Sequence, residues 1–159
     1  MMIIRALAVG FALLIVPMAE SAQADEQATV QVFYDFLSNP VSEENAAAFK
    51  AAVAEDWESI GDYSGETKSR EELMGQMGGF AQLIPDLNWA VEEMIQSGNQ
   101  VVVRGRATGT PNGPLFGVDG KGKGFEIMSI DIHTVEGGSI VRTYHVEDWS
   151  GALRQVGAD

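Results

Sequence analysis

Hydrophobic residues recur every three or four positions through the first half of the chain, which is the spacing of amphipathic helices. Three helices are predicted, at residues 27–37, 42–53 and 69–84. Asn39-Pro40 ends the first helix, because a residue before proline avoids helical backbone. Ser42 can cap the second helix, and Ser69 to Glu72 form a capping box at the start of the third.

From residue 88 onward the period of the pattern shortens to two, which is typical of β-strands. Four strands are predicted, at residues 88–96, 100–110, 125–135 and 140–148. The segment 111–124 between them is rich in glycine and proline, and it predicts a long loop of the kind that caps a binding site. Helices followed by antiparallel strands predict an α+β domain with the helices packed on one face of a curved sheet.

The closing hairpin carries both histidines of the chain. Alternate residues of a strand share a face. Polar side chains gather on one face of each strand: Ser129, Asp131 and His133 on the first, and Thr143, His145 and Glu147 on the second. So many polar groups among Ile, Met, Val and Phe need either solvent or a pocket.

The turn of this hairpin decides which side chains meet. A two-residue turn pairs Asp131 with Tyr144, whereas a three-residue loop over 136–138 with a bulge pairs Asp131 with Thr143. We favour the bulge, which places Asp131 diagonally next to His145. The other face then carries Met128, Ile130, Ile132, Tyr144 and Val146.

The N-terminus reads as a secretory signal peptide. Arg5 precedes an apolar run over residues 6–16, and Ala22-Gln-Ala24 offers a small-x-small cleavage site. We therefore expect a signal peptide at 1–24, a single domain at 25–159, and a periplasmic or secreted protein without stable membrane association. An uncleaved anchor is the alternative, although the run is short for a membrane span.

Charge and composition narrow the class of partner. The formal net charge of −13 argues against nucleic acid, whose phosphates require basic patches. Without cysteine there is neither a disulfide nor a thiolate metal site. No phosphate-binding glycine motif and no Gly-x-Ser-x-Gly nucleophile elbow is present.

Several short motifs follow one another in a familiar order. They are Pro85-Asp-Leu87 before the first strand pair, Thr108-Gly-Thr110, Gly117, the Gly137-Gly138 hairpin, Asp148-Trp149 and Leu153-Arg-Gln155. Their order and spacing resemble the SnoaL-like polyketide cyclases, also called ester cyclases, of the nuclear-transport-factor-two-like superfamily. The resemblance implies a cone-shaped α+β barrel with a deep apolar pocket, often dimeric through the sheet. It also implies cofactor-free aldol ring closure, with an aspartate on the last strand as acid and base.

This chain departs from that pattern at the site. The position of the family's catalytic aspartate falls on His145, and that of a pocket histidine falls on Asp131. A histidine titrates near neutrality, and a neighbouring carboxylate can orient its ring. We therefore predict His145 as the catalytic base and Asp131 as its orienting partner. A purely structural His–Asp hydrogen bond is the alternative.

His133 is placed at the pocket mouth or, near a strand end, on the solvated surface. Together with His145 and Asp131 it allows a 2-His-1-carboxylate metal site. The resembling family needs no metal, so we expect no metal and no cofactor.

The remaining candidates concern substrate binding. Glu147 and Asp148 point to opposite faces, so that one can enter the pocket while the other caps the next turn. Arg104 and Arg106 either bind a carboxylate ligand or pair with surface acids. The predicted substrate-binding residues are Trp57, Tyr63, Trp89, Phe116, Ser129 and Glu147, although each aromatic residue is also suited to the core.

The sequence thus predicts a secreted cyclase- or isomerase-like enzyme that transfers protons at a carbonyl compound. Its expected partners are a small hydrophobic ligand and a second copy of the chain. One alternative is a non-catalytic binding protein with the same pocket. Another is an interaction module that uses the outer face of the sheet.

Overall fold

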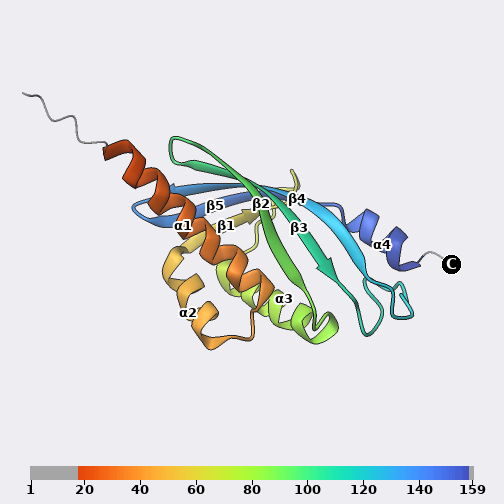
Figure 1. The fold of residues 1–159 in the computed structure, drawn as a ribbon. Coiled ribbons are helices and arrows are strands. Elements are labelled where there is room, and N and C mark those ends of the chain that lie inside the picture. Colours follow the sequence, from red (N-terminus) through yellow and green to blue (C-terminus); the bar gives the residue numbers. More distant parts are fainter. Residues whose placement is uncertain (1–17, 158–159) are drawn as a thin grey trace, which may run out of the picture.

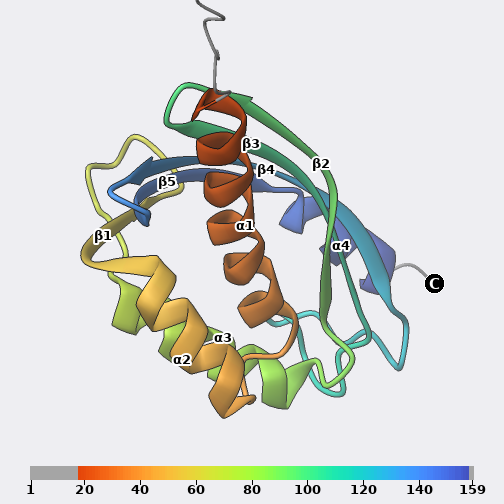
Figure 2. The same cartoon turned by 60° about the vertical axis from the view of Figure 1, so that its left-hand side comes forward.

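A curved five-stranded sheet wraps around helices in the computed structural model, which describes residues 18–157 (Figure 1). The helices are α1 (Met18–Ser38), α2 (Glu43–Ala52), α3 (Arg70–Leu83) and α4 (Trp149–Gly157). The strands are β1 (Val53–Ile60), β2 (Asn88–Ser97), β3 (Gln100–Gly109), β4 (Phe125–Glu136) and β5 (Ser139–Glu147). Helix α1 runs along the concave side of the sheet, and α2 and α3 lie on that side too (Figure 2).

The predicted signal peptide lies largely outside the described residues. Residues 1–17 are not described, and the cleavage predicted after Ala24 falls within the range of α1. Cleavage therefore stays a prediction. No helix within residues 18–157 is long and apolar enough to cross a membrane.

The predicted α+β class is confirmed, but the sheet differs from the expected antiparallel barrel. Its strand order is β1-β5-β4-β3-β2, and all neighbours are antiparallel except β1, which pairs with β5 in parallel. The sheet is therefore mixed, and β1 and β2 form two separate edges rather than closing a barrel.

Strand β1 was not predicted, because its pattern is interrupted. Val53, which we expected at the end of a helix, is the first residue of the strand. Val53, Trp57 and Ser59 are buried, but the register shifts between Val53 and Glu58, and this irregularity hides the period of two. The pairing partner of β1 is β5, which is remote in sequence.

Caps confirm the predicted starts of the second and third helices, whereas the first helix, predicted from residue 27, already begins at Met18. Ser42 Oγ accepts from the backbone N–H of Asn45 (3.2 Å) at the start of α2. At the start of α3, the backbone N–H of Ser69 donates to Glu72 Oε2 (2.8 Å), and that of Glu72 donates to Ser69 Oγ (3.3 Å). Each cap satisfies N–H groups that the helix itself leaves unpaired.

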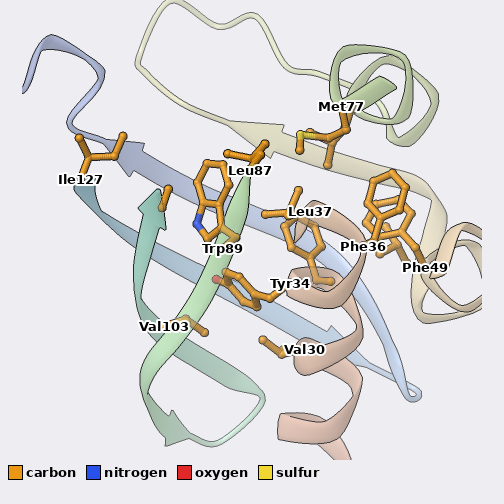
Figure 3. Close-up of a cluster of buried hydrophobic side chains, with 14 of the residues drawn as sticks. Val30, Tyr34, Phe36, Leu37, Phe49, Met77, Leu87, Trp89, Val103 and Ile127 are labelled. Carbon is orange, nitrogen blue, oxygen red and sulfur yellow. The ribbon is translucent and has the colours of Figure 1, made fainter. Parts of the chain in front are cut away.

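Aromatic side chains fill the space between the helices and the sheet (Figure 3). Phe36 of α1 stacks on Phe49 of α2, with ring centroids 4.3 Å apart. Phe33 contacts both Phe49 and Trp57, at centroid distances of 5.4 and 5.9 Å. These contacts fix α1 and α2 against β1, and so position the inward-facing side of α1.

Both predicted registers of the closing hairpin are wrong. The turn has two residues, Gly137 and Gly138, each with positive φ, as a type I′ turn requires. A bulge further along leaves Val141 unpaired, which moves the register by one more residue. Asp131 therefore lies directly opposite His145. The outer face is as predicted, with Met128, Tyr144 and Val146 exposed.

Substituting Phe49 by alanine tests the aromatic packing. Phe49 is fully buried, so the Phe49→Ala variant should lose about 3–5 kcal/mol of unfolding free energy in urea titrations. Val41→Ala is the control, because Val41 is 72% exposed and its truncation should change stability by no more than about 0.5 kcal/mol. Equal losses in the two variants would contradict this account of the core.

Candidate functional site

A cavity of about 70 Å³ lies between the helices and the concave face of the sheet. Its wall is largely apolar. The polar side chains in the wall come mainly from β5 and β4. The lining residues are Phe33, Leu37, Ser59, Lys68, Leu73, Gln76, Met77, Phe80, Trp89, Asp131, Thr143, His145, Glu147 and Trp149. Leu37, Met77 and Trp89 are drawn in Figure 3.

Asp131 is the most buried carboxylate of this wall, with 5% of its surface exposed. Its Oδ2 accepts from the hydroxyls of Tyr34 (2.9 Å) and Ser129 (3.2 Å). Burial, and then the negative charge of Glu147, raise the pKa of Asp131 from 3.8 to about 7. The two hydrogen bonds and the charge of His145 act in the opposite direction. Asp131 therefore changes its protonation state near neutral pH.

His145 is paired with Glu147 rather than with Asp131 as we expected. Its Nδ1 lies 2.8 Å from Glu147 Oε1, because alternate residues of β5 share a face. A carboxylate only accepts, so Nδ1 carries the proton and Nε2 remains for a substrate. The hydrogen bond to Glu147 raises the pKa of His145, and partial burial opposes this shift.

Asp131, His145 and Glu147 form one compact group. One potential ligand atom from each lies within 4.8 Å of the others, so these residues could hold a cation. A cation would replace the hydrogen bond between His145 and Glu147. His133 does not join them, so the alternative that the sequence allowed, a metal site of two histidines and Asp131, is not assembled among the described residues.

His133 is fully buried, not solvated as we expected. Strand β4 continues past it to Glu136, and α1 covers it. Its Nε2 lies 2.9 Å from the hydroxyl of Tyr34, and its Nδ1 lies 2.9 Å from Thr143 Oγ1. Burial, with the charge of His145, lowers the pKa of His133 to about 3, so that it stays neutral.

Five of the six predicted substrate-binding residues separate into three groups. Trp89 and Glu147 line the cavity. Ser129 and Trp57 lie behind the wall: Ser129 accepts from Trp89 Nε1 (3.1 Å), and Trp57 Nε1 donates to Thr143 Oγ1 (3.0 Å). The prediction that Tyr63 lines the pocket is wrong, because its side chain is fully exposed in the segment after β1.

The glycine-rich loop does not cap the cavity as predicted. No residue of 111–124 lines it, and Phe116 is 57% exposed. The ring of Phe116 contacts Phe80 and Trp149, which do line the cavity, with centroids 6.2 and 5.5 Å apart. The loop therefore supports the wall from outside.

The charged residues left open by the sequence take structural roles. Arg104 pairs with Glu93 (3.4 Å) and Arg106 with Glu92 (2.6 Å), as surface ion pairs. Asp148 accepts from the backbone N–H of Gly151 (2.8 Å) and so caps α4, while Glu147 enters the site.

Four polar residues of the site were missed: Tyr34, Ser59, Lys68 and Gln76. Ser59 lies on β1, a strand that was not predicted. Tyr34 could have been found, because helical spacing places it beside Phe33 on the buried face, and a buried hydroxyl needs a partner. Lys68 and Gln76 carried no such signal. Lys68 lies in an irregular segment, and nothing in the pattern of α3 distinguishes Gln76 from a surface residue.

Comparison with known proteins assigns the family. A family model described as SnoaL-like polyketide cyclase matches residues 29–156. The chain belongs to the SnoaL-like polyketide cyclase family. No curated protein matches this SnoaL-like chain.

Solved structures agree on the fold. IdmH from Streptomyces antibioticus, a candidate polyketide cyclase, has 23% identity and a TM-score of 0.72, covering 84% of this chain and 99% of IdmH. A candidate SnoaL-like polyketide cyclase from Jannaschia sp. CCS1 has 20% identity and a TM-score of 0.72, with coverages of 86% and 94%. AclR from Streptomyces galilaeus, a candidate hydroxylase, has 17% identity and a TM-score of 0.70, with coverages of 84% and 96%. At these identities the likeness shows the fold alone.

Replacing Glu147 by glutamine tests the electrostatics of the site. The charge of Glu147 raises the pKa of both His145 and Asp131, so in Glu147→Gln both pKa values should fall. Imidazole and carboxyl chemical shifts, followed by NMR across a pH titration, measure them. Glu136→Gln removes an equal charge at the distant hairpin turn and should leave both values unchanged. An unaltered pKa of Asp131 in Glu147→Gln would refute the coupling.

The pKa of Asp131 also makes stability depend on pH. Between about pH 4 and 7 the folded chain holds a proton on Asp131 that the unfolded chain has lost, so stability falls as pH rises. Asp131→Asn does not titrate. Its unfolding free energy relative to wild type should rise across this window, by up to about 1.4 kcal/mol per pH unit.

Urea unfolding of both chains at several pH values measures this difference. His133, whose pKa is lowered, acts in the opposite direction: neutral His133 favours the fold above about pH 6.5, and this contribution is lost as pH falls towards about 3. Both chains share it, so it cancels in the difference. A difference that is constant from pH 4 to 7 would show that Asp131 is an ordinary acid.

Proposed function

We propose that this SnoaL-like chain is a small-molecule enzyme that catalyses cyclisation or isomerisation by proton transfer next to a carbonyl group. The observation that carries the proposal is the direct opposition of two groups in one cavity wall. His145, held by Glu147, faces Asp131, which titrates near neutrality. Such reactions are redox-neutral and need only an acid, a base and a shaped site.

In this proposal His145 is the base. Its Nδ1–H is held by Glu147, so Nε2 takes the proton from the carbon next to the carbonyl group, and Glu147 stabilises the imidazolium that forms. A positioned base of this kind contributes about 10²–10⁴-fold to the rate. The same imidazolium returns the proton to the product, either at another carbon or at the oxygen of a closed ring.

Asp131 acts in its protonated form as a hydrogen-bond donor to the enolate oxygen. Burial favours the neutral acid. Tyr34 and Ser129 donate to Oδ2, which leaves the second oxygen to face the cavity. A neutral carboxylic acid in an apolar site is a known device for stabilising an enolate. This role replaces the ring-orienting role that we predicted, which belongs to Glu147.

The volume of the cavity limits what enters it. A cavity of about 150 Å³ binds benzene, so about 70 Å³ holds roughly three non-hydrogen atoms by the same ratio. The reacting end of the substrate therefore enters, beside the apolar side chains of Phe33 and Met77, and the rest of the ligand remains at the opening. This supports a small carbonyl compound in preference to a fused-ring polyketide held whole.

We further propose that the enzyme works outside the cytoplasm after cleavage at Ala24, and that it dimerises. The exposed apolar side chains of Met128, Tyr144 and Val146 on the outer face of the sheet support an interface between two copies.

Two substitutions test the mechanism. With a panel of small 1,3-dicarbonyl compounds that includes acetylacetone and acetoacetate, NMR in D₂O measures exchange of the protons next to the carbonyl group. His145→Gln should slow the catalysed exchange about 100-fold or more. Asp131→Asn keeps a hydrogen-bond donor and should retain most of the rate, while losing the decline in activity that ionisation of Asp131 causes above about pH 7.

Glu136→Gln, at the distant hairpin turn, is the control and should behave as wild type. If Asp131→Asn is as inactive as His145→Gln, Asp131 is the base and the assignment is reversed. A non-catalytic binding protein is the second candidate. Ligands that mass spectrometry finds retained by the purified protein, and that neither exchange nor turn over, would favour it.

A further inference from the structure

The cavity meets a second hollow at its edge. A surface depression of about 280 Å³ lies over the segment between β1 and α3. Ser59, Lys68 and His145 line both the cavity and this depression. These residues therefore form a neck between the surface depression and the cavity.

Lys68 is held firmly at this neck. Its backbone N–H donates to the carbonyl of Ser59 (3.0 Å), and its carbonyl accepts from the N–H of Ser59 (2.9 Å). These two hydrogen bonds attach the segment after β1 to the strand itself. Lys68 Nζ then donates to Oε1 of Gln76 on α3. The ammonium is thus placed by β1, the neighbour of β5 in the sheet, and by α3.

The charge of Lys68 has no carboxylate partner within 4.0 Å among residues 26–157, whose side chains the structure describes. Its hydrogen-bond acceptor, Gln76, is neutral. The charge of Lys68 helps to lower the pKa of Glu72, but the Glu72 carboxylate is hydrogen-bonded to Ser69. Among the residues of the cavity wall, Lys68 is the one lysine or arginine. An ammonium that is fixed in place and lacks an ion-pair partner is suited to bind an anionic ligand.

The same charge acts on the proposed base. The positive charge of Lys68 lowers the pKa of His145, in opposition to Glu147. When His145 takes a proton, two cations face one neck. An anionic group on the substrate, bound at Lys68, neutralises one of them and so favours proton abstraction.

We propose that the substrate carries a carboxylate that binds Lys68 and Gln76 at the neck, with its carbonyl end inside the cavity. The substrate is thus a small oxo acid, an identification that rests on the proposed function. Gln76 accepts from Lys68 through Oε1, which leaves its amide N–H groups to donate to the carboxylate. Asp62 and Glu66 line the outer depression and repel an anion there, so the anionic group is confined to Lys68.

Paired ligands test this inference through binding alone. Acetoacetate and its neutral methyl ester differ in the one charge, and calorimetry or NMR titration measures the affinity of each for the full chain. Wild type should bind acetoacetate at least about tenfold more tightly, the scale of one hydrogen bond to a charged group. Lys68→Met should remove this preference without changing the affinity for the ester.

Two further variants make the test decisive. Lys68→Arg keeps the charge and should keep the preference for acetoacetate. Lys123→Met removes an exposed lysine of the glycine-rich loop and should change neither affinity. Equal affinity of wild type for acid and ester, no measurable binding of acetoacetate, or a preference that persists in Lys68→Met overturns the inference.

The outcome for Lys68 is separable from that for catalysis. If proton exchange depends on His145 but acetoacetate and its methyl ester behave alike, the proposed function is retained and the oxo-acid substrate is rejected. Binding that depends on Lys68, without any exchange that depends on His145, would establish the anion site and reject the enzyme.

Discussion

The fold and the site share one constraint, which is that a carboxyl group buried under α1 must have hydrogen-bond donors. Asp131 receives them from Tyr34 of α1 and from Ser129, its neighbour on β4. Trp89 of β2 donates in turn to Ser129. A buried polar group without partners costs about 1–3 kcal/mol. The helix and the sheet must therefore pack in the one arrangement that brings these groups together.

The hydrogen bond that Tyr34 donates to Asp131 sets the direction of a longer chain of hydrogen bonds. The single hydroxyl proton of Tyr34 goes to Asp131, so Tyr34 accepts from His133 Nε2. Nδ1 of the neutral His133 then accepts from Thr143, whose oxygen accepts from Trp57. The chain of donors thus runs from β1 through β5 and β4 to α1, and ends at Asp131. His133 serves this chain, and its lowered pKa keeps the ring neutral at neutral pH, so that one ring nitrogen can accept a hydrogen bond.

How far the sequence predicts this arrangement depends on how far apart in the sequence the interacting residues lie. Caps at Ser42 and Ser69 are local, and the pattern located them. The polar face of the hairpin was also predicted, because alternation along β4 and β5 is local. The register was not, since the bulge at Val141 leaves no mark in the alternation of side chains. His133 was misplaced for a similar reason: the residues that cover it come from α1, about 100 positions earlier.

The sequence predicts an exchange of acid and imidazole relative to the family pattern, and the register of β4 and β5 offers a simple geometric basis for it. Residues directly opposite each other on antiparallel strands have Cβ atoms about 4.5–5.5 Å apart, so Asp131 and His145 can trade places without moving either strand. Burial then decides the chemistry. The β4 position is nearly closed to solvent, which keeps an acid there neutral to about pH 7. The β5 position is more open, and Glu147 two residues on supplies a carboxylate, so an imidazole there can accept a proton. In the proposed mechanism, the predicted exchange keeps one acid and one base in the cavity and moves the base from a carboxylate to an imidazole.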